Sequence, residues 1–276
     1  MKGQIVKIIS NDYFVESNNN EYICKARGKL KESKETLKVG DFVLFDNDQK
    51  VIEKVLPRKN TLDRPLVSNI DTAFIVTSLT KPDLSTNLLD KFLVVCEINN
   101  IEAVICITKK DLVNRKEFKK INNVLNYYKK IGYKVVYNTS LFKIKKLIKN
   151  KVIVLTGQTG SGKSTLINKL DKNLNFETGE ISKALGRGKH TTRHVSLVKI
   201  GKGKVLDTPG FSALSLEDYS IDEIKHSFIE FKNYKCKYKG CIHKKEEGCM
   251  VKRQVGKTIL KSRYENYLKF IERGQK

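Results

Sequence analysis

Hydrophobic residues along the chain follow two different rhythms. In the first sixty or so residues, short β-branched and aromatic runs alternate with polar turn material. The pattern predicts five short strands, at residues 3–9, 13–16, 22–27, 41–45 and 51–56. Strands this short and closely spaced are typical of a small barrel, so we predict an OB-fold for residues 1–62.

The middle of the chain has a second rhythm, in which strands alternate with helices. Strands are expected at 70–79, 101–108, 133–137, 152–156, 195–200 and 204–206. Helical spacing is found at 88–99, 116–130, 140–150 and from 163 onward, and again at 221–231 and 259–271. This alternation indicates an α/β domain with a mostly parallel sheet. Residues 56–65 have no regular period and contain two prolines, so they are predicted to be a linker.

Two interpretations of the barrel's aromatic residues stay open. OB barrels often bind single-stranded nucleic acid through a basic face with exposed aromatics. Such a face would combine Tyr13, Phe14, Tyr22, Lys25 and Arg27. Alternatively, the aromatics belong to the core and the basic side chains are solvated edges, and the strand pattern favours neither.

A phosphate-binding loop follows the strand at 152–156. The loop and the start of its helix read Gly157-Gln158-Thr159-Gly160-Ser161-Gly162-Lys163-Ser164-Thr165, which matches Gly-x4-Gly-Lys-Ser/Thr between a strand and a helix. Backbone N–H groups in such a loop surround phosphate oxygens, and the helix directs its positive end at the same anion. We expect Lys163 to reach the β- and γ-phosphates and the Ser164 hydroxyl to bind Mg²⁺.

A second motif at the end of another strand indicates the base. Thr108-Lys109-Lys110-Asp111 resembles the [Asn/Thr]-Lys-x-Asp motif of GTPases. A carboxylate at Asp111 can accept hydrogen bonds from N1–H and the 2-amino group of guanine, whereas adenine would leave it unpaired. The weakest candidate is Thr139-Ser140, which would contact the guanine O6.

The remaining GTPase motifs follow the phosphate loop. Asp207-Thr208-Pro209-Gly210 matches Asp-x-x-Gly, in which Asp207 would hold Mg²⁺ through water and the Gly210 N–H would sense the γ-phosphate. Thr191 or Thr192 would complete the Mg²⁺ shell. Because ordinary GTPases place the guanine motif last and this chain places it first, the domain is predicted to be circularly permuted.

Three cysteines and a histidine cluster near the C-terminus. The four residues Cys236, Cys241, His243 and Cys249 lie within a short segment. Four sulfur and nitrogen ligands suit a closed tetrahedral zinc site, which we predict to be structural. The other cysteines, Cys24, Cys96 and Cys106, are expected to be small buried hydrophobic residues.

Taken together, these motifs resemble the RsgA (YjeQ/YloQ) family of circularly permuted GTPases. The similarity covers the barrel-like start, the permuted motifs, Gly-Arg-Gly-Lys-His-Thr-Thr at 186–192, Asp-Thr-Pro-Gly-Phe at 207–211 and the Cys/His cluster. It implies an OB-fold at 1–62, a permuted GTPase domain at 63–214 and a helical zinc domain at 215–276. It also implies GTP hydrolysis stimulated by the small (30S) ribosomal subunit, and a role in the late maturation of that subunit.

The motifs lack the usual hydrolytic residue of GTPases. Phe211 stands where many GTPases have a glutamine that orients the attacking water. The family's switch-loop histidine corresponds to His190, which we predict to position the water. The alternative is that His190 binds RNA or shapes the loop. Arg187 and Arg193 would either offset γ-phosphate charge or contact RNA.

The composition of the chain indicates the partners and the location of the protein. The net charge is +24, which attracts polyanions and favours rRNA as a partner. A genome whose composition favours lysine codons would give a similar bias. No apolar run suits a membrane span or a signal peptide, so we expect the protein to be cytoplasmic. We also expect a monomer that binds one structural Zn²⁺, and Mg²⁺ beside GTP. Two alternatives remain: a GTP-dependent RNA-binding or chaperone factor acting off the ribosome, and a non-enzymatic RNA-binding protein.

Overall fold

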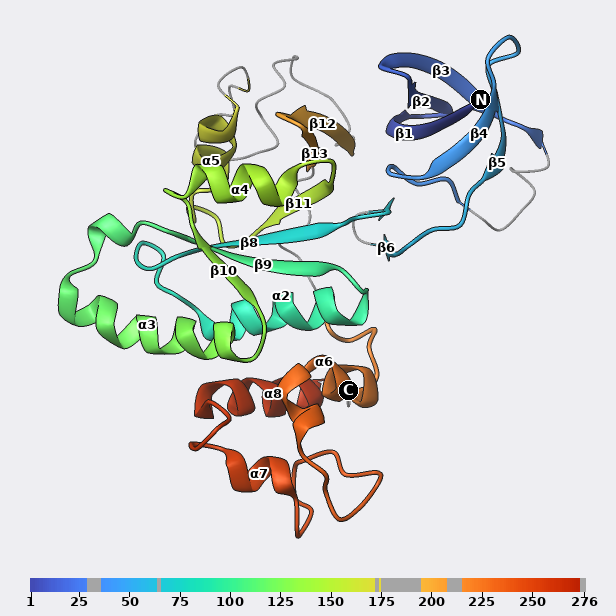
Figure 1. Cartoon of the computed structure of the whole chain (residues 1–276). Helices are drawn as coiled ribbons and strands as arrows, with labels where there is room; N and C mark the ends of the chain where they lie inside the picture. The colour runs from blue at the N-terminus through green and yellow to red at the C-terminus, as the bar shows by residue number, and fades with distance from the viewer. Residues whose placement is uncertain (29–35, 64–65, 172–173, 175–194, 208–214, 274–276) are drawn as a thin grey trace. The chain divides into compact units, whose positions relative to one another are not determined.

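The computed structural model (Figure 1) describes residues 1–28, 36–63, 66–171, 174, 195–207 and 215–273. The chain divides into two compact units. The first unit comprises Met1–Ala73, Ser140–Leu155 and Lys163–Ser212. The second comprises Phe74–Thr139, Thr156–Gly162 and Ala213–Lys276.

The first unit begins with a closed five-stranded barrel (Figure 1). Its strands are β1 (Lys2–Ile9), β2 (Asp12–Ser17), β3 (Asn20–Ala26), β4 (Phe42–Asp46) and β5 (Val51–Val55). They are ordered β1-β2-β3-β5-β4, and pairing of β1 with β4 closes the barrel. Alternate residues of each strand point inward, and Ile5, Val15, Val43 and Ile52 fill the interior with no exposed surface. The barrel predicted from the strand spacing is therefore confirmed.

The proposed aromatic and basic face of the barrel is not a single surface. Tyr13 and Tyr22 pack against the barrel core, whereas Phe14 follows Tyr13 in β2 and so points to the opposite side. Lys25 is paired with Asp12 at 2.6 Å. The alternation of side chains along a strand therefore places the two tyrosines and Phe14 on opposite sides.

The segment predicted as a linker, residues 56–65, contains the first strand of a short hairpin, which corrects that prediction. Strands β6 (Thr61–Asp63) and β7 (Leu66–Ser68) pair antiparallel, with Thr61 opposite Ser68. The fully buried carboxylate of Asp41 accepts hydrogen bonds from the Arg58 side chain at 2.7 and 2.8 Å and from the Ser68 hydroxyl at 2.6 Å. Three-residue strands are too short to show a period, and the buried ion pair that fixes them joins distant residues.

The rest of the first unit belongs to the α/β region. It contains α4 (Leu141–Ile148), β11 (Val152–Thr156), α5 (Lys163–Leu170), β12 (Ser196–Ile200) and β13 (Gly203–Asp207). β11 and β13 are parallel, and β12 and β13 form an antiparallel hairpin whose first strand pairs with β1. All five residues of β11 are buried, as expected for a strand covered on both faces. The division between the units falls within β8 and β11.

The second unit contains a three-stranded sheet edge and most of the helices. Its strands are ordered β10-β9-β8 and run over β8 (Thr72–Ser78), β9 (Glu102–Thr108) and β10 (Lys134–Tyr137). Its longer helices are α2 (Thr86–Ile98), which packs on β9, and α3 (Arg115–Lys130), which packs on β10. The helices begin at side-chain caps: the Ser85 hydroxyl accepts from the Leu88 N–H, and the Asn114 amide oxygen accepts from the Glu117 N–H.

The C-terminal part of this unit is helical. It contains α6 (Ile221–Ser227), η3 (Ile229–Asn233), α7 (Met250–Gln254) and α8 (Lys261–Arg273), and α6 and α8 pack against α2 (Figure 1). Ser220 and Glu223 form a reciprocal capping box at the start of α6. The predicted single helix at 221–231 is broken at Phe228, and α7 was not predicted, because a five-residue helix has no measurable period.

A buried ionic cluster joins α8 to α2 and η3. Arg263 has no exposed surface; its guanidinium contacts the Asp90 carboxylate at 2.6 Å and the Glu230 carboxylate at 2.8 Å. The Tyr128 hydroxyl donates to Asp90 at 2.6 Å, and the Asn266 amide donates to the other Asp90 oxygen at 2.7 Å. Every charge in this cluster therefore has a partner, which is the condition for keeping ions inside a core.

Candidate functional site

The phosphate loop makes a close approach to β8. Gly157 has a φ of +135°, and a Cβ on this residue would lie 2.0 Å from the Val76 carbonyl oxygen. Only glycine fits there, because a side chain would clash with the backbone and would adopt a strained φ. The first glycine of the motif is thus required by packing as well as by the ligand.

Lys163 and Ser164 begin helix α5. Both are at least half-buried, and burial lowers the pKa of Lys163. An ammonium group held away from water interacts more strongly with a phosphate than an exposed one, since the local dielectric constant is lower. The start of a helix is also where backbone N–H groups lack intrahelical partners and attract anions.

The segment predicted to read guanine lies directly against the phosphate loop. The Thr108 hydroxyl donates a 2.6 Å hydrogen bond to the Ser161 carbonyl oxygen, and a Cβ on Gly162 would lie 3.5 Å from the Thr108 methyl group. The hydroxyl of Ser161 is buried and has no hydrogen-bond partner in the described part of the chain. A buried polar atom without a partner is costly, so this loop fits a ligand that supplies one.

The remaining residues of this segment are held by a tight turn. Lys109 has a left-handed φ of +56° and precedes the short helix η1 (Lys110–Leu112). Its ammonium group donates to the Lys81 carbonyl oxygen. The Lys110 ammonium lies over the Phe118 ring at 4.6 Å and over the Tyr137 ring at 5.0 Å. Asp111 lies in η1, three residues after the end of β9, and its exposed side chain is accessible to a ligand.

The second segment predicted to contact the base, which begins at Thr139, lies beside the first. β10 is parallel to β9, with Tyr137 opposite Ile107, and the Asn138 N–H donates to the Ile107 carbonyl at 2.9 Å. Thr139 therefore follows β10 at the edge where Thr108 ends β9. Carboxyl ends of neighbouring parallel strands are where ligands bind in open α/β sheets.

The switch residues are described in part. Asp207 is the last residue of β13, parallel to the strand that feeds the phosphate loop. The other predicted switch and catalytic residues lie outside the described residues: Arg187, His190, Thr191, Thr192, Arg193, Gly210 and Phe211.

The Cys/His cluster has the dimensions of a metal site. The Cys236, Cys241 and Cys249 sulfurs lie 3.5, 3.3 and 3.4 Å from the His243 Nδ1, and the Cys236 and Cys249 sulfurs are 3.8 Å apart. A tetrahedral Zn²⁺ site places its sulfurs about 3.8 Å apart and its sulfur and nitrogen ligands about 3.6 Å apart. The four residues thus fit a zinc ion. Burial lowers the pKa of His243, which favours the neutral imidazole that binds metals.

Neighbouring side chains hold the loop that carries these ligands. The Glu246 carboxylate accepts hydrogen bonds from the backbone N–H groups of Ile242, Lys244 and Lys245 at 2.6, 2.8 and 3.0 Å. The Tyr264 hydroxyl donates to the His243 carbonyl at 2.6 Å. Sequence reasoning missed Glu246, although a carboxylate between the last two ligands of a turning loop is a usable signal.

Comparisons with known proteins identify the family of the chain. The family model described as RsgA GTPase matches residues 55–217, and the model of the RsgA N-terminal domain matches residues 2–51. A protein of Oceanobacillus iheyensis named small ribosomal subunit biogenesis GTPase RsgA 2 is 45% identical, with 98% of this chain and 96% of that protein covered. A Pediococcus pentosaceus protein named small ribosomal subunit biogenesis GTPase RsgA is 43% identical, with 98% and 92% covered.

Solved structures give the same result for the fold. The crystal structure of YjeQ from Thermotoga maritima superposes with a TM-score of 0.87 at 34% identity, covering 100% of this chain and 99% of that one. YloQ, described as a circularly permuted GTPase, gives 0.82 at 34% identity, covering 99% and 94%. The fold class predicted from the order of the motifs is confirmed, and the chain belongs to the RsgA GTPase family.

Proposed function

We propose that this RsgA-family GTPase acts in the late maturation of the small (30S) ribosomal subunit. It hydrolyses GTP to GDP and phosphate, and binding to the subunit stimulates the reaction. The observation that carries this proposal is the similarity, over almost the whole chain, to proteins named small ribosomal subunit biogenesis GTPase. The contact between Thr108 and Ser161 supports it, since one site then reads the base and binds the phosphates.

The roles of the site residues follow from their chemistry. Asp111 accepts hydrogen bonds from guanine, Lys163 contacts the β- and γ-phosphates, and Ser164 binds Mg²⁺. Asp207 holds the same ion through water, and Gly210 with Thr191 or Thr192 senses the γ-phosphate. His190 positions the attacking water.

The zinc domain is proposed to be residues 215–276, after the barrel at 1–62 and the GTPase domain at 63–214. One structural Zn²⁺ bound by Cys236, Cys241, His243 and Cys249 holds its basic loop in shape. Because the chain is permuted, the switch at Gly210 leads into this domain. Loss of the γ-phosphate therefore acts on the segment that precedes α6.

The partners proposed are the 30S subunit and its rRNA, bound by a monomer. The net charge of +24 supports contact with RNA, which is the most abundant polyanion of a ribosomal subunit. Every helix in the described ranges is too short or too polar to cross a bilayer. Assembly of subunits takes place in the cytoplasm, which is where we place the protein.

GTP turnover with and without purified 30S subunits tests this function. We expect the subunits to raise turnover at least tenfold, and the Lys163→Ala variant to show no turnover in either condition. Turnover that the subunits leave unchanged would contradict the proposal. The His190→Ala variant separates the catalytic proposal from the general one: it should bind subunits normally and lose the stimulated rate.

The alternative, a GTP-dependent RNA factor acting off the ribosome, is not favoured by the names of the relatives. Cosedimentation with 30S subunits separates the two functions. The main proposal requires the protein to bind 30S subunits more tightly with a non-hydrolysable GTP analogue than with GDP. An off-ribosome factor would stay in the supernatant with both nucleotides.

A further inference from the structure

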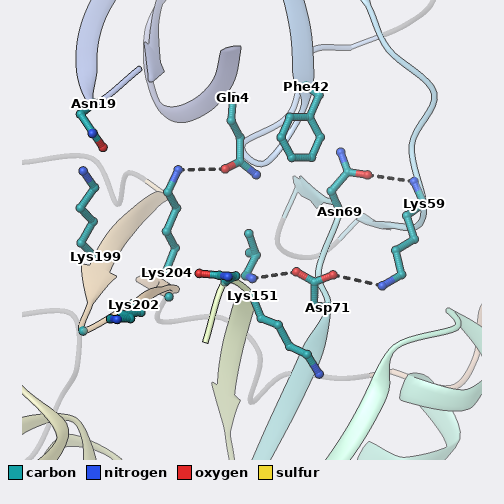
Figure 2. Close-up of a pocket in the computed structure, with 14 residues that line it drawn as sticks. Gln4, Asn19, Phe42, Lys59, Asn69, Asp71, Lys151, Lys199, Lys202 and Lys204 are labelled. Carbon is teal, nitrogen blue, oxygen red and sulfur yellow. Dashed lines mark hydrogen bonds and ion pairs between the residues drawn. The ribbon is translucent and has the colours of Figure 1, made fainter. Parts of the chain in front are cut away.

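A polar cavity lies in the first unit, between the barrel and the β11–β13 strands (Figure 2). Its volume is about 670 Å³, within the range of small-molecule sites. The lining contains five lysines, at positions 59, 151, 199, 202 and 204, and a single carboxylate, that of Asp71. None of the motifs described above contributes to it, so the GTP site does not account for this concentration of charge.

Acidic side chains neutralise the lysines only in part. Glu16, beside the cavity, is shared by two ammonium groups: Lys204 at 3.2 Å and Lys199 at 3.3 Å. Lys204 also donates to the Gln4 amide oxygen at 3.0 Å (Figure 2). Lys202 is exposed, and its ammonium group has no acceptor among the described residues. Ammonium groups that line one cavity repel one another, and a bound anion would reduce that cost.

The cavity wall is fixed before any ligand binds. The Asp71 carboxylate accepts from the Val152 N–H at 2.8 Å, and the Asp71 N–H donates to the Val152 carbonyl at 2.9 Å. Gly203 packs so closely that a Cβ there would lie 2.2 Å from the Ile148 carbonyl oxygen. The turn that carries Lys202 is therefore held against the start of β11, and binding needs little reordering of the backbone.

We propose that this cavity binds the phosphate groups of a nucleotide, at a site separate from the phosphate loop. Lys199, Lys202 and Lys204 come from one hairpin and supply the cationic side. Phe42, which is 37% exposed, lies at the cavity and provides a flat face for a base (Figure 2). The amide side chains of Asn19 and Asn69 add polar groups to the wall.

The cavity and the phosphate loop are at opposite ends of the same strand. Val152, the first residue of β11, lines the cavity, whereas the loop follows the last residue, Thr156. Five residues of strand span about 15 Å. A nucleotide in the cavity is thus too far from Lys163 to be the GTP that the enzyme hydrolyses.

The phosphate groups have two possible sources, a free nucleotide or a nucleotide within single-stranded RNA, and the test distinguishes them. The protein is first saturated with GDP to fill the guanine site. One arm then measures the affinity for a fluorescent ADP, and the other the affinity for a labelled ten-residue uridine oligonucleotide. The probe that binds identifies the source.

The variants compare two pairs of exposed lysines in the same unit. The test protein carries Lys199→Glu and Lys202→Glu, and the control carries Lys145→Glu and Lys146→Glu on α4, which makes the same change in net charge. We expect the test protein to bind the preferred probe at least tenfold more weakly than the control. Basal GTP turnover stays within twofold in both, so failure here is separable from failure of the GTPase function.

The inference is overturned if the wild-type protein binds neither probe at low salt. It is also overturned if the two double variants lose affinity equally, because the effect would then be net charge alone. Thermal melting establishes that both variants are folded. Should the glutamate variant melt early, the Lys202→Gln variant decides the question, with at least a threefold loss expected and an unchanged affinity counting against the site.

Discussion

The Thr108 hydroxyl donates a hydrogen bond of 2.6 Å to the carbonyl oxygen of Ser161, 53 residues further along the chain. Thr108 begins the segment proposed to read the base, and Ser161 lies in the loop proposed to bind the phosphates. The bond is buried and fixes these two segments to each other. In the proposed site, this bond therefore ties the segment that reads the base to the loop that binds the phosphates.

Removal of this bond is expected to weaken nucleotide binding. Thr108→Val keeps the shape of the side chain and leaves the Ser161 carbonyl without its donor, at a cost of about 1–2 kcal/mol. GDP affinity, measured by titration with a fluorescent analogue, should fall about five- to thirtyfold. Thr108→Ser keeps the hydroxyl and should bind within about threefold of wild type; equal losses in both variants would contradict a role for the bond.

Asp111 is expected to determine the choice of base. Asp111→Asn replaces an acceptor with a donor opposite the guanine 2-amino group, which should cost about 3 kcal/mol, or a hundredfold in GTP affinity. Xanthine has an oxygen at that position and accepts from the new amide. The variant should therefore prefer XTP in a competition assay, and continued preference for GTP would exclude this role.

The glycine that packs against β8 is expected to be essential for stability. Gly157→Ala would place a methyl group 2.0 Å from the Val76 carbonyl oxygen at a strained φ, and should lower the free energy of unfolding by about 3 kcal/mol or more. Gly201→Ala is the control, since its φ is also positive, at +53°, but no atom lies within 4 Å of the added carbon. Chemical denaturation should show a loss of only about 1 kcal/mol there. Similar losses in the two variants would contradict the packing argument.

Loss of one thiolate is expected to abolish stoichiometric metal binding. Cys249→Ser removes a ligand whose sulfur lies 3.4 Å from the His243 nitrogen, so elemental analysis should find well under one zinc per protein. Because structural zinc contributes folding energy, the variant should also melt at a lower temperature. Cys24→Ala, in the barrel, should retain a full equivalent of zinc, and a metal-free wild-type protein would refute the site.

The buried cluster around Arg263 is expected to tolerate substitution only when its positive and negative charges are removed together. Arg263→Ala leaves two buried carboxylates without a cation and should cost about 3–5 kcal/mol of unfolding free energy. Arg27→Ala is the surface control: its ion pair with Glu53 is largely exposed, and its loss should cost less than about 1 kcal/mol. Adding Asp90→Asn and Glu230→Gln to Arg263→Ala should restore part of the loss in urea unfolding, because no charge then stays unpaired.

Sequence reasoning predicted the motifs because their chemistry requires particular residues at fixed spacing. The phosphate loop needs a glycine at position 157 and a lysine at position 163, at the start of its helix, and both residues lie in one nine-residue segment. The four zinc ligands are similarly close in sequence. Longer strands and helices were also predictable, since each shows several turns or alternations of its hydrophobic period.

Features that depend on distant residues were not predictable. The β6–β7 hairpin is held by Asp41 and Arg58, which a linker-like composition concealed. The lysine-rich cavity combines residues up to 200 positions apart, such as Gln4 and Lys204. In both cases the residues that interact are far apart in the sequence and come together only in the folded chain. A short stretch of sequence therefore cannot reveal the interaction.

The position of Arg263 also constrains how the protein is made. A translating ribosome adds 173 further residues after Asp90 before the guanidinium that neutralises it exists. At the usual rate of about 5–20 residues per second, this takes roughly 9–35 s. During that interval α2 cannot complete its burial without leaving Asp90 uncompensated. We therefore expect α2 to complete its burial only after α8 has been synthesised.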